Sequence, residues 1–127
     1  MFICNHCPYV KAIIRDLIKE CNDLKKYGIN SVAIMSNDTN NYPEDSFENM
    51  IKFSEINKFG SINYLIDESQ EIAKKYGAVC TPDFFGYNKD LGLQYRGRFK
   101  ELKDLKTISD EESDLTLAMK MISETQK

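Results

Sequence analysis

The stretch Phe-Ile-Cys-Asn-His-Cys-Pro-Tyr-Val, residues 2–10, decides the fold of this 127-residue chain. It contains a short apolar run, a Cys-x-x-Cys pair and the first turn of an amphipathic helix. Proline lacks a backbone N–H and is tolerated in the first helical turn, so Pro8 predicts a helix that begins slightly before it, at about Asn5. A strand ending at Cys4, followed by this helix, would bring the two thiols together. The stretch therefore predicts a redox site at a helix N-terminus.

The two thiols are expected to have different roles. Free backbone N–H groups and the helix dipole favour an anion at a helix N-terminus, so we expect an ionised Cys4 with a pKa below the ordinary thiol value of about 8.5. Cys4 is then the expected nucleophile. Cys7, closer to the helix interior, is the expected resolving thiol. His6 lies between them and, as a cation, would favour the thiolate further, although it can also be read as an exposed polar loop residue.

A Cys-x-x-Cys pair is also half of a zinc site, and by itself it decides little. The sequence has no second such pair and only one histidine, so a complete metal site would need Cys80 and His6 besides Cys4 and Cys7. Redox chemistry is the favoured interpretation. No metal and no cofactor are predicted.

Composition and charge exclude several classes of partner. The net charge is −3 and charges of both signs are interspersed, so neither nucleic acid nor a membrane surface is expected as a partner. No apolar run approaches the roughly 18 residues of a membrane span. The four cysteines are unevenly spaced, which is not typical of a disulfide scaffold. A reducing, cytoplasmic location is therefore the expectation.

The chain length predicts one domain, residues 1–127, with a core over 1–99 and a linker and helix over 100–127. Apolar residues recur every three or four positions from Pro8 to Tyr27, which predicts an amphipathic helix ended by Gly28. Cys21 falls on the apolar side and is expected in the core. Residues 29–35 are β-branched and predict a buried strand, parallel to the first one through a helical crossover.

The remaining elements follow from the same signals. Thr81-Pro82 precedes an apolar strand, and we expect a cis peptide bond there. Residues 88–92 predict a hairpin turn that leads to an antiparallel strand. The segment from residue 100 is charged and is expected to be a mobile linker before a terminal helix that begins near Leu115 and packs on the sheet. Further elements are expected over residues 43–58 (helix), 64–66 (strand), 67–76 (helix), 78–87 (strand) and 93–96 (strand).

This order of elements resembles the thioredoxin fold. The motif of residues 2–10, together with Ser-Asn-Asp at 36–38, Tyr-Pro-Glu-Asp at 42–45, Cys-Thr-Pro-Asp-Phe-Phe at 80–85 and Tyr-Arg-Gly-Arg at 95–98, is similar to thioredoxin-like proteins of the alkyl hydroperoxide reductase and thiol-specific antioxidant (AhpC/TSA) superfamily. The resemblance runs from Met1 to about Arg98. It implies an α/β three-layer sandwich whose mixed sheet has parallel strands and a C-terminal antiparallel hairpin. It also implies that Thr81, before a cis Pro82, lies beside the cysteine pair and binds the substrate backbone.

Two departures from the superfamily pattern matter. Its members usually have a strand, a helix and often a β-hairpin before the cysteine-bearing strand, which this sequence lacks. Residues 29–35 would then form an exposed sheet edge, so we expect either a truncated sequence or a homodimer that covers the edge. Peroxiredoxins, in addition, have Thr or Ser three residues before the peroxidatic cysteine, and neither Cys4 nor Cys7 has one. Direct peroxide reduction is therefore the weaker enzymatic interpretation.

The sequence predicts a thiol–disulfide oxidoreductase that acts on a protein or small-molecule disulfide and is restored by a reducing partner. Cys80 is left open as a third redox thiol, a metal ligand or a small loop residue. A peroxiredoxin-like peroxidase, a copper- or zinc-binding chaperone and a non-catalytic binding module are the alternatives. The expected catalytic residues are Cys4 and Cys7, and the expected substrate-binding residues are His6, Thr81 and Pro82.

Overall fold

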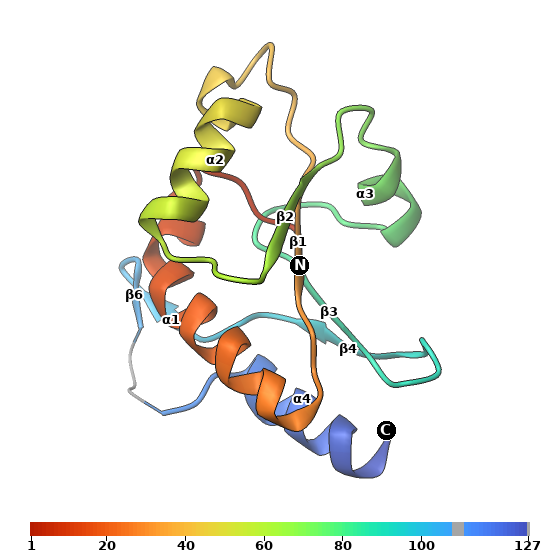
Figure 1. Cartoon of the computed structure of the whole chain (residues 1–127). Helices are drawn as coiled ribbons and strands as arrows, with labels where there is room; N and C mark the ends of the chain where they lie inside the picture. Colours follow the sequence, from red (N-terminus) through yellow and green to blue (C-terminus); the bar gives the residue numbers. More distant parts are fainter. Residues whose placement is uncertain (108–110, 127) are drawn as a thin grey trace.

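The computed structural model describes residues 1–107 and 111–126 and has helices on a set of parallel and antiparallel strands (Figure 1). Its elements are α1 (Pro8–Leu24), β1 (Val32–Met35), α2 (Phe47–Ile56), β2 (Asn63–Ile66), α3 (Glu71–Tyr76), β3 (Phe84–Tyr87), β4 (Leu93–Gly97), β5 (Leu102–Lys103), β6 (Lys106–Thr107) and α4 (Asp114–Thr125). Two short 3-10 turns cover Lys25–Tyr27 and Pro43–Asp45.

The N-terminal segment joins the parallel strands to the antiparallel hairpin. β1 is parallel to β2, and β3 is antiparallel to β4. Between these pairs, Phe2 forms a parallel bridge with Ile34 of β1 and an antiparallel bridge with Asp83, the residue before β3. The backbone bonds Phe2 N–H to Asp83 C=O (2.9 Å) and Ile3 N–H to Ile34 C=O (3.0 Å) hold it there. The predicted mixture of parallel strands and a C-terminal hairpin is confirmed.

The expectation that residues 29–35 form an exposed sheet edge is wrong. β1 has a neighbour on each side, because β2 pairs along its whole length and the N-terminal segment pairs with Ile34. The predicted strand at 64–66 is the neighbour that covers this edge of β1. Nothing in the sequence of residues 64–66 indicates which strand they pair with. A homodimer through a sheet edge stays a prediction.

α1 buries its apolar side and ends as predicted. Gly28 adopts the left-handed conformation (φ 76°) that ends the helix and the 3-10 turn after it. Cys21 is 3% exposed, which confirms its place in the core. The helix begins at Pro8 and not at Asn5, with Cys7 as its N-cap residue. The buried residues of α1 are Val10, Ile13, Ile14, Leu17, Ile18, Cys21 and Leu24.

The predicted helix over 43–58 is divided into two parts. A 3-10 turn covers Pro43–Asp45, and α2 starts after Ser46, whose hydroxyl accepts a hydrogen bond from the backbone N–H of Asn49 (3.2 Å). This serine N-cap satisfies a free donor of the first turn and resets the helix start. The division matters because it leaves Asp45 in the turn, pointing away from the path of α2 and into the molecule.

The C-terminal segment is more ordered than its charge suggests. β5 and β6 form a small antiparallel hairpin, so the expected mobile linker is wrong for residues 102–107, while residues 108–110 of it lie outside the described residues. α4 packs against α1, β3 and β4, as expected for a helix that returns to the sheet (Figure 1). Its residues Leu115, Met119 and Ile122 are buried. Over the described ranges, no helix has the length and apolarity that a membrane span requires.

Candidate redox site

Both cysteines of the motif contact Thr81. The Thr81–Pro82 peptide bond is cis, as the sequence predicts. The Thr81 hydroxyl lies 3.5 Å from Sγ of Cys4, and the thiol of Cys7 donates to the Thr81 carbonyl at 3.6 Å. Both sulfurs therefore contact one residue that is more than 70 positions away in the chain. All four cysteines are free thiols, and a disulfide between Cys4 and Cys7 stays a prediction.

The solvent access of the two thiols does not match their expected roles of Cys4 as nucleophile and Cys7 as resolving thiol. Cys4 is 0% exposed, whereas Cys7 is partly exposed at the N-cap of α1. Burial raises the pKa of the Cys4 thiol, and hydrogen bonds from the Thr81 hydroxyl and the Cys7 backbone N–H offset this only in part. The expectation of an ionised, solvent-open Cys4 is wrong, because the helix begins at Pro8 and leaves Cys4 at the buried end of the N-terminal segment. The positive end of α1 lies at Cys7 instead.

The residues between the cysteines are held by a buried carboxylate. Asp45 is 0% exposed. Its Oδ1 accepts the backbone N–H groups of Asn5 (2.7 Å) and His6 (3.3 Å). Its Oδ2 lies 2.5 Å from Nδ1 of His6 and accepts the side-chain amide of Asn37 (2.9 Å). Four hydrogen bonds thus offset the cost of burying this charge. Because an ionised carboxylate only accepts, Nδ1 of His6 is the nitrogen that carries the hydrogen.

A second layer of contacts fixes Asn5 and His6 from outside. The hydroxyl of Tyr64, on β2, donates to Oδ1 of Asn5 (2.8 Å), and the amide of Asn5 donates to the Glu44 carbonyl (3.1 Å). Burial raises the pKa of the Tyr64 hydroxyl, so it stays a donor at neutral pH. The ring of Tyr42 stacks on His6, with 5.1 Å between ring centroids. The two residues between the cysteines are therefore anchored by β2 and by the 3-10 turn.

Sequence reasoning missed Asp45, Asn5, Asn37 and Tyr64 as parts of the site. Asp45 belongs to a Pro-Glu-Asp-Ser stretch that reads as a helix start, and Asn37 belongs to a polar run that reads as a solvated loop. The Tyr-Pro-Glu-Asp motif at 42–45 did contribute to the family resemblance. Its spacing alone, however, gives no sign that its aspartate reaches the cysteine pair.

Metal-ligating atoms of three residues lie close together here. Sγ of Cys4, a ring nitrogen of His6 and a carboxylate oxygen of Asp45 are all within 4.8 Å of one another. Each carboxylate oxygen of Asp45 already accepts two hydrogen bonds, and on each oxygen one of the two comes from His6. Asp45 and His6 are therefore hydrogen-bonded to each other. Among the described residues, Cys7 and Cys80 do not join this group, so the four-ligand set considered from the sequence is not assembled.

A pocket of about 270 Å³ opens beside Thr81. Cys80, which is exposed, stands in its wall, and so does Asn37, the residue that donates to Asp45. The pocket therefore borders both the contact to the cysteines and the network around His6. Its remaining lining residues are Phe2, Ser36, Gln70, Ala73, Lys74, Ala78 and Val79.

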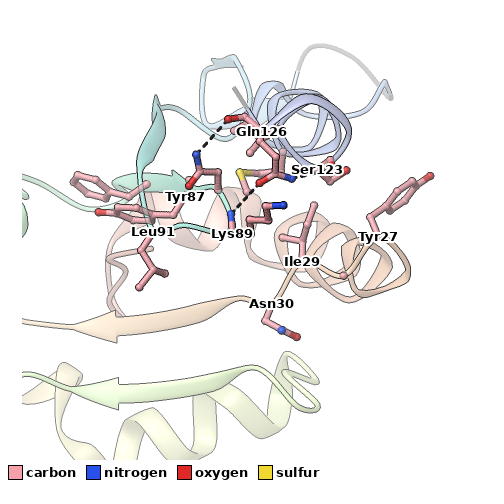
Figure 2. A pocket seen from close by; sticks show the side chains of 14 residues that line it. Tyr27, Ile29, Asn30, Tyr87, Lys89, Leu91, Ser123 and Gln126 are labelled. Carbon is pink, nitrogen blue, oxygen red and sulfur yellow. Dashed lines mark hydrogen bonds between the residues drawn. The ribbon is translucent and has the colours of Figure 1, made fainter.

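A second hollow, of about 410 Å³, lies at the other end of α1 (Figure 2). It is bordered by the segment Tyr27–Asn30, the β3–β4 turn and the end of α4. Gln126 closes one side, since its carbonyl accepts the Asn88 amide (3.2 Å) and its side chain accepts the backbone N–H of Lys89 (3.0 Å). Within the part of the chain that the structure describes, no cysteine or histidine lines it, so this hollow is separate from the redox site.

Comparison with known proteins gives a family and two similar structures. The model of the AhpC/TSA family matches residues 1–100. Among curated proteins, no match to the chain is found. A solved structure of an uncharacterized conserved protein from Geobacillus kaustophilus is 42% identical to the chain, with a TM-score of 0.91. A hypothetical protein from Sinorhizobium meliloti 1021 is 35% identical, with a TM-score of 0.87.

These likenesses extend over almost the whole chain and confirm the thioredoxin-like fold. Each alignment covers 98% of this chain, but only 66% of the Geobacillus protein and 67% of the Sinorhizobium protein. The chain therefore spans about two thirds of the length of the structures that it matches.

Proposed function

The chain belongs to the AhpC/TSA family, a family of thioredoxin-like redox proteins, and we propose that it is a thiol–disulfide oxidoreductase that uses Cys4 and Cys7. One observation carries the proposal: both sulfurs contact Thr81, while one is accessible and the other is buried. An accessible thiol can attack a substrate, and a buried neighbour can then release it. The substrate class is a protein or small-molecule disulfide.

The order of attack follows from accessibility. Cys7 is the thiol that a substrate can reach, and it lies at a helix end that favours an anion. Its thiolate attacks the substrate disulfide, forms a mixed disulfide and expels the first substrate thiolate. Cys4 then attacks the sulfur of Cys7 and expels the second one. The cysteine pair loses two electrons and becomes a disulfide, while the substrate disulfide becomes two thiols.

Thr81, Pro82 and His6 are proposed to orient the substrate. The pocket beside Thr81 gives room for the chain that carries the disulfide, and Cys80 in its wall is a candidate third thiol. A dithiol partner would return the pair to the reduced form. The proposal places this cycle in the cytoplasm, where cellular reductants keep thiols free.

The test is reduction of insulin, or of a small model disulfide, with an added dithiol as the reductant. Cys4→Ser and Cys7→Ser should each lower turnover to the uncatalysed rate. Cys21→Ala, which changes a core thiol outside the site, is the matched control and should keep wild-type turnover. Cys80→Ser tests the candidate third thiol, since this substitution slows turnover only if Cys80 takes part in the reaction. Equal turnover in wild type, Cys4→Ser and Cys7→Ser would remove the proposal.

Peroxide reduction is the second candidate, because the family match covers residues 1–100. Cys7 is partly exposed and precedes Pro8 at the helix start, so a peroxide can reach its sulfur. Hydrogen peroxide consumption with the same dithiol distinguishes the two activities. Peroxide turnover that depends on Cys7 and exceeds disulfide turnover would favour the peroxidase.

A further inference from the structure

The buried thiol of Cys4 has to lose a proton before it can attack. In the proposed cycle, which this inference takes as its basis, Cys4 attacks the mixed disulfide on Cys7. A thiol is a poor nucleophile until it becomes a thiolate, and Cys4 is 0% exposed. Burial also raises the pKa of its thiol. The step therefore requires a proton acceptor next to Cys4.

His6 is the group in position to accept it. A ring nitrogen of His6 lies within 4.8 Å of Sγ of Cys4, a separation that one bridging water can span. His6 is also the only histidine in the sequence. Its side chain is 31% exposed, so a proton taken from Cys4 can pass on to solvent or to a leaving group.

We propose that Cys4, His6 and Asp45 form a proton-transfer unit, in which His6 takes the proton of Cys4 and Asp45 is a positioning residue. Asp45 holds the hydrogen of the neutral ring on Nδ1, so the lone pair that accepts a proton is on Nε2. The same carboxylate fixes the backbone of Asn5 and His6. A nucleophile, a base and a carboxylate that orients the base form a recurring catalytic arrangement.

The Cys4 thiol gives its proton to Nε2 of His6, and the resulting thiolate attacks Sγ of Cys7 in the mixed disulfide. The bond between Cys4 and Cys7 forms as the bond between Cys7 and the substrate sulfur breaks. The substrate leaves as a thiolate and takes the proton from His6. The substrate sulfur is reduced, the Cys4 sulfur is oxidised, and His6 returns to its neutral form.

Two substitutions separate the base from the residue that positions it. In Asp45→Asn the side-chain oxygen can still accept the backbone N–H groups of Asn5 and His6, but the amide nitrogen then faces Nδ1 of His6. The ring must move its hydrogen to Nε2, which removes the acceptor. In His6→Asn the new amide nitrogen can replace Nδ1 as the donor to Asp45, but it cannot accept a proton.

The experiment uses a dinitrobenzoate disulfide reagent, which releases one coloured thiolate when Cys7 attacks and a second when Cys4 resolves the mixed disulfide. Because this coloured thiolate leaves without taking up a proton, the rate of the second release depends on removal of the Cys4 proton and not on protonation of the leaving group. All variants carry Cys80→Ser, which removes the other exposed thiol. Asp45→Asn and His6→Asn should each slow the second release about 10- to 100-fold, and far more than they slow the first.

Two controls distinguish positioning from a structural effect. Asp67→Asn changes another buried carboxylate, one that contacts Ser36 and the start of α3, and should keep both releases at the wild-type rate. In the double variant His6→Asn/Asp45→Asn, the second release should be no slower than in His6→Asn. Nitrogen-15 NMR of the single histidine should show hydrogen on Nδ1 in the wild type and on Nε2 in Asp45→Asn.

Each outcome decides the inference. An unchanged second release in His6→Asn overturns it, even if Asp45→Asn does not fold. Equal slowing of both releases in Asp45→Asn, or a further slowing by Asp45→Asn on top of His6→Asn, also overturns it, since either result indicates a general structural effect. If Cys4→Ser releases both thiolates at the wild-type rate, the proposed function itself fails.

Discussion

The hydroxyl of Thr81 lies 3.5 Å from the sulfur of Cys4, although 77 positions separate the two residues. The sheet makes this contact possible. Asp83 pairs with Phe2 through two backbone hydrogen bonds, of 2.9 and 3.1 Å, and this pairing carries Thr81 back to the cysteine. The redox site is therefore assembled by strand pairing, and it combines a motif near the start of the chain with a loop near residue 80.

Thr81→Val should slow the resolution step. The Thr81 hydroxyl lowers the pKa of the Cys4 thiol, against the larger effect of burial that raises it. Loss of the hydroxyl raises the pKa further, so less thiolate is present at neutral pH. A hydrogen bond of about 1 kcal/mol corresponds to a roughly fivefold slower second release of the coloured thiolate.

Thr116→Val is the matched control for this prediction. Thr116 is buried in α4, and its hydroxyl has no hydrogen-bond partner among the described residues. Its loss should leave both releases unchanged and should keep or raise the free energy of unfolding. A second release that is as fast in Thr81→Val as in the wild type would contradict the assigned contact.

Gly86→Ala should destabilise the packing of α4 on β3. A Cβ at this position would overlap with Sδ of Met119 and lie 3.2 Å from Cβ of Tyr95. Overpacking of this kind costs about 1–3 kcal/mol of unfolding free energy, which urea denaturation measures. Met119→Ala should recover part of the loss, since it removes the overlapping sulfur. Equal stability of Gly86→Ala and wild type would show that Met119 of α4 does not pack against Gly86.

Local signals were sufficient for most elements of the fold and for part of the site. The cis bond before Pro82, the core position of Cys21 and the helix end at Gly28 all depend on residue type and spacing over a few positions. Pro8 correctly indicated a helix start. The predicted start at Asn5 is three residues too early, because proline is compatible with any position in the first turn.

The parts that failed depend on contacts between distant segments. The ionised Cys4 was expected from a helix end that lies at Cys7, and its burial results from strand pairing that no local pattern encodes. Asp45 was hidden for the same reason, since its partners come from residues 5–6 and from Asn37. The neighbour of β1 could not be assigned, because residues 63–66 give a strand signal without a partner.

Asp67→Asn should lower the free energy of unfolding at neutral pH. It should also make that free energy fall less steeply as the solution becomes acidic. Burial alone would raise the pKa of the Asp67 carboxyl, but hydrogen bonds from the Ala73 backbone, the Ser36 hydroxyl and the Ile72 backbone outweigh this and lower it. Because the folded pKa lies below the unfolded value of about 3.9, the stabilisation is complete above that value. It is lost as the pH falls through the folded pKa.

Urea denaturation at a series of pH values measures this contribution. The variant should be about 1–3 kcal/mol less stable than the wild type at pH 7, and the gap should shrink as the pH falls below about 4. A gap that stays constant down to pH 2 would contradict the assigned hydrogen bonds. Wild-type activity in this variant at pH 7 is expected, because Asp67 does not contact either cysteine of the pair.

Mass spectrometry of trapped mixed disulfides tests the central claim most directly. Cys4→Ser and Cys7→Ser, each in a Cys80→Ser background, are incubated with the oxidised model disulfide and mapped by peptide. If the accessible thiol of Cys7 attacks first and the buried thiol of Cys4 resolves, Cys4→Ser accumulates substrate on Cys7, and Cys7→Ser accumulates almost none. Substrate trapped on Cys4 in Cys7→Ser, with none on Cys7 in Cys4→Ser, would contradict the account.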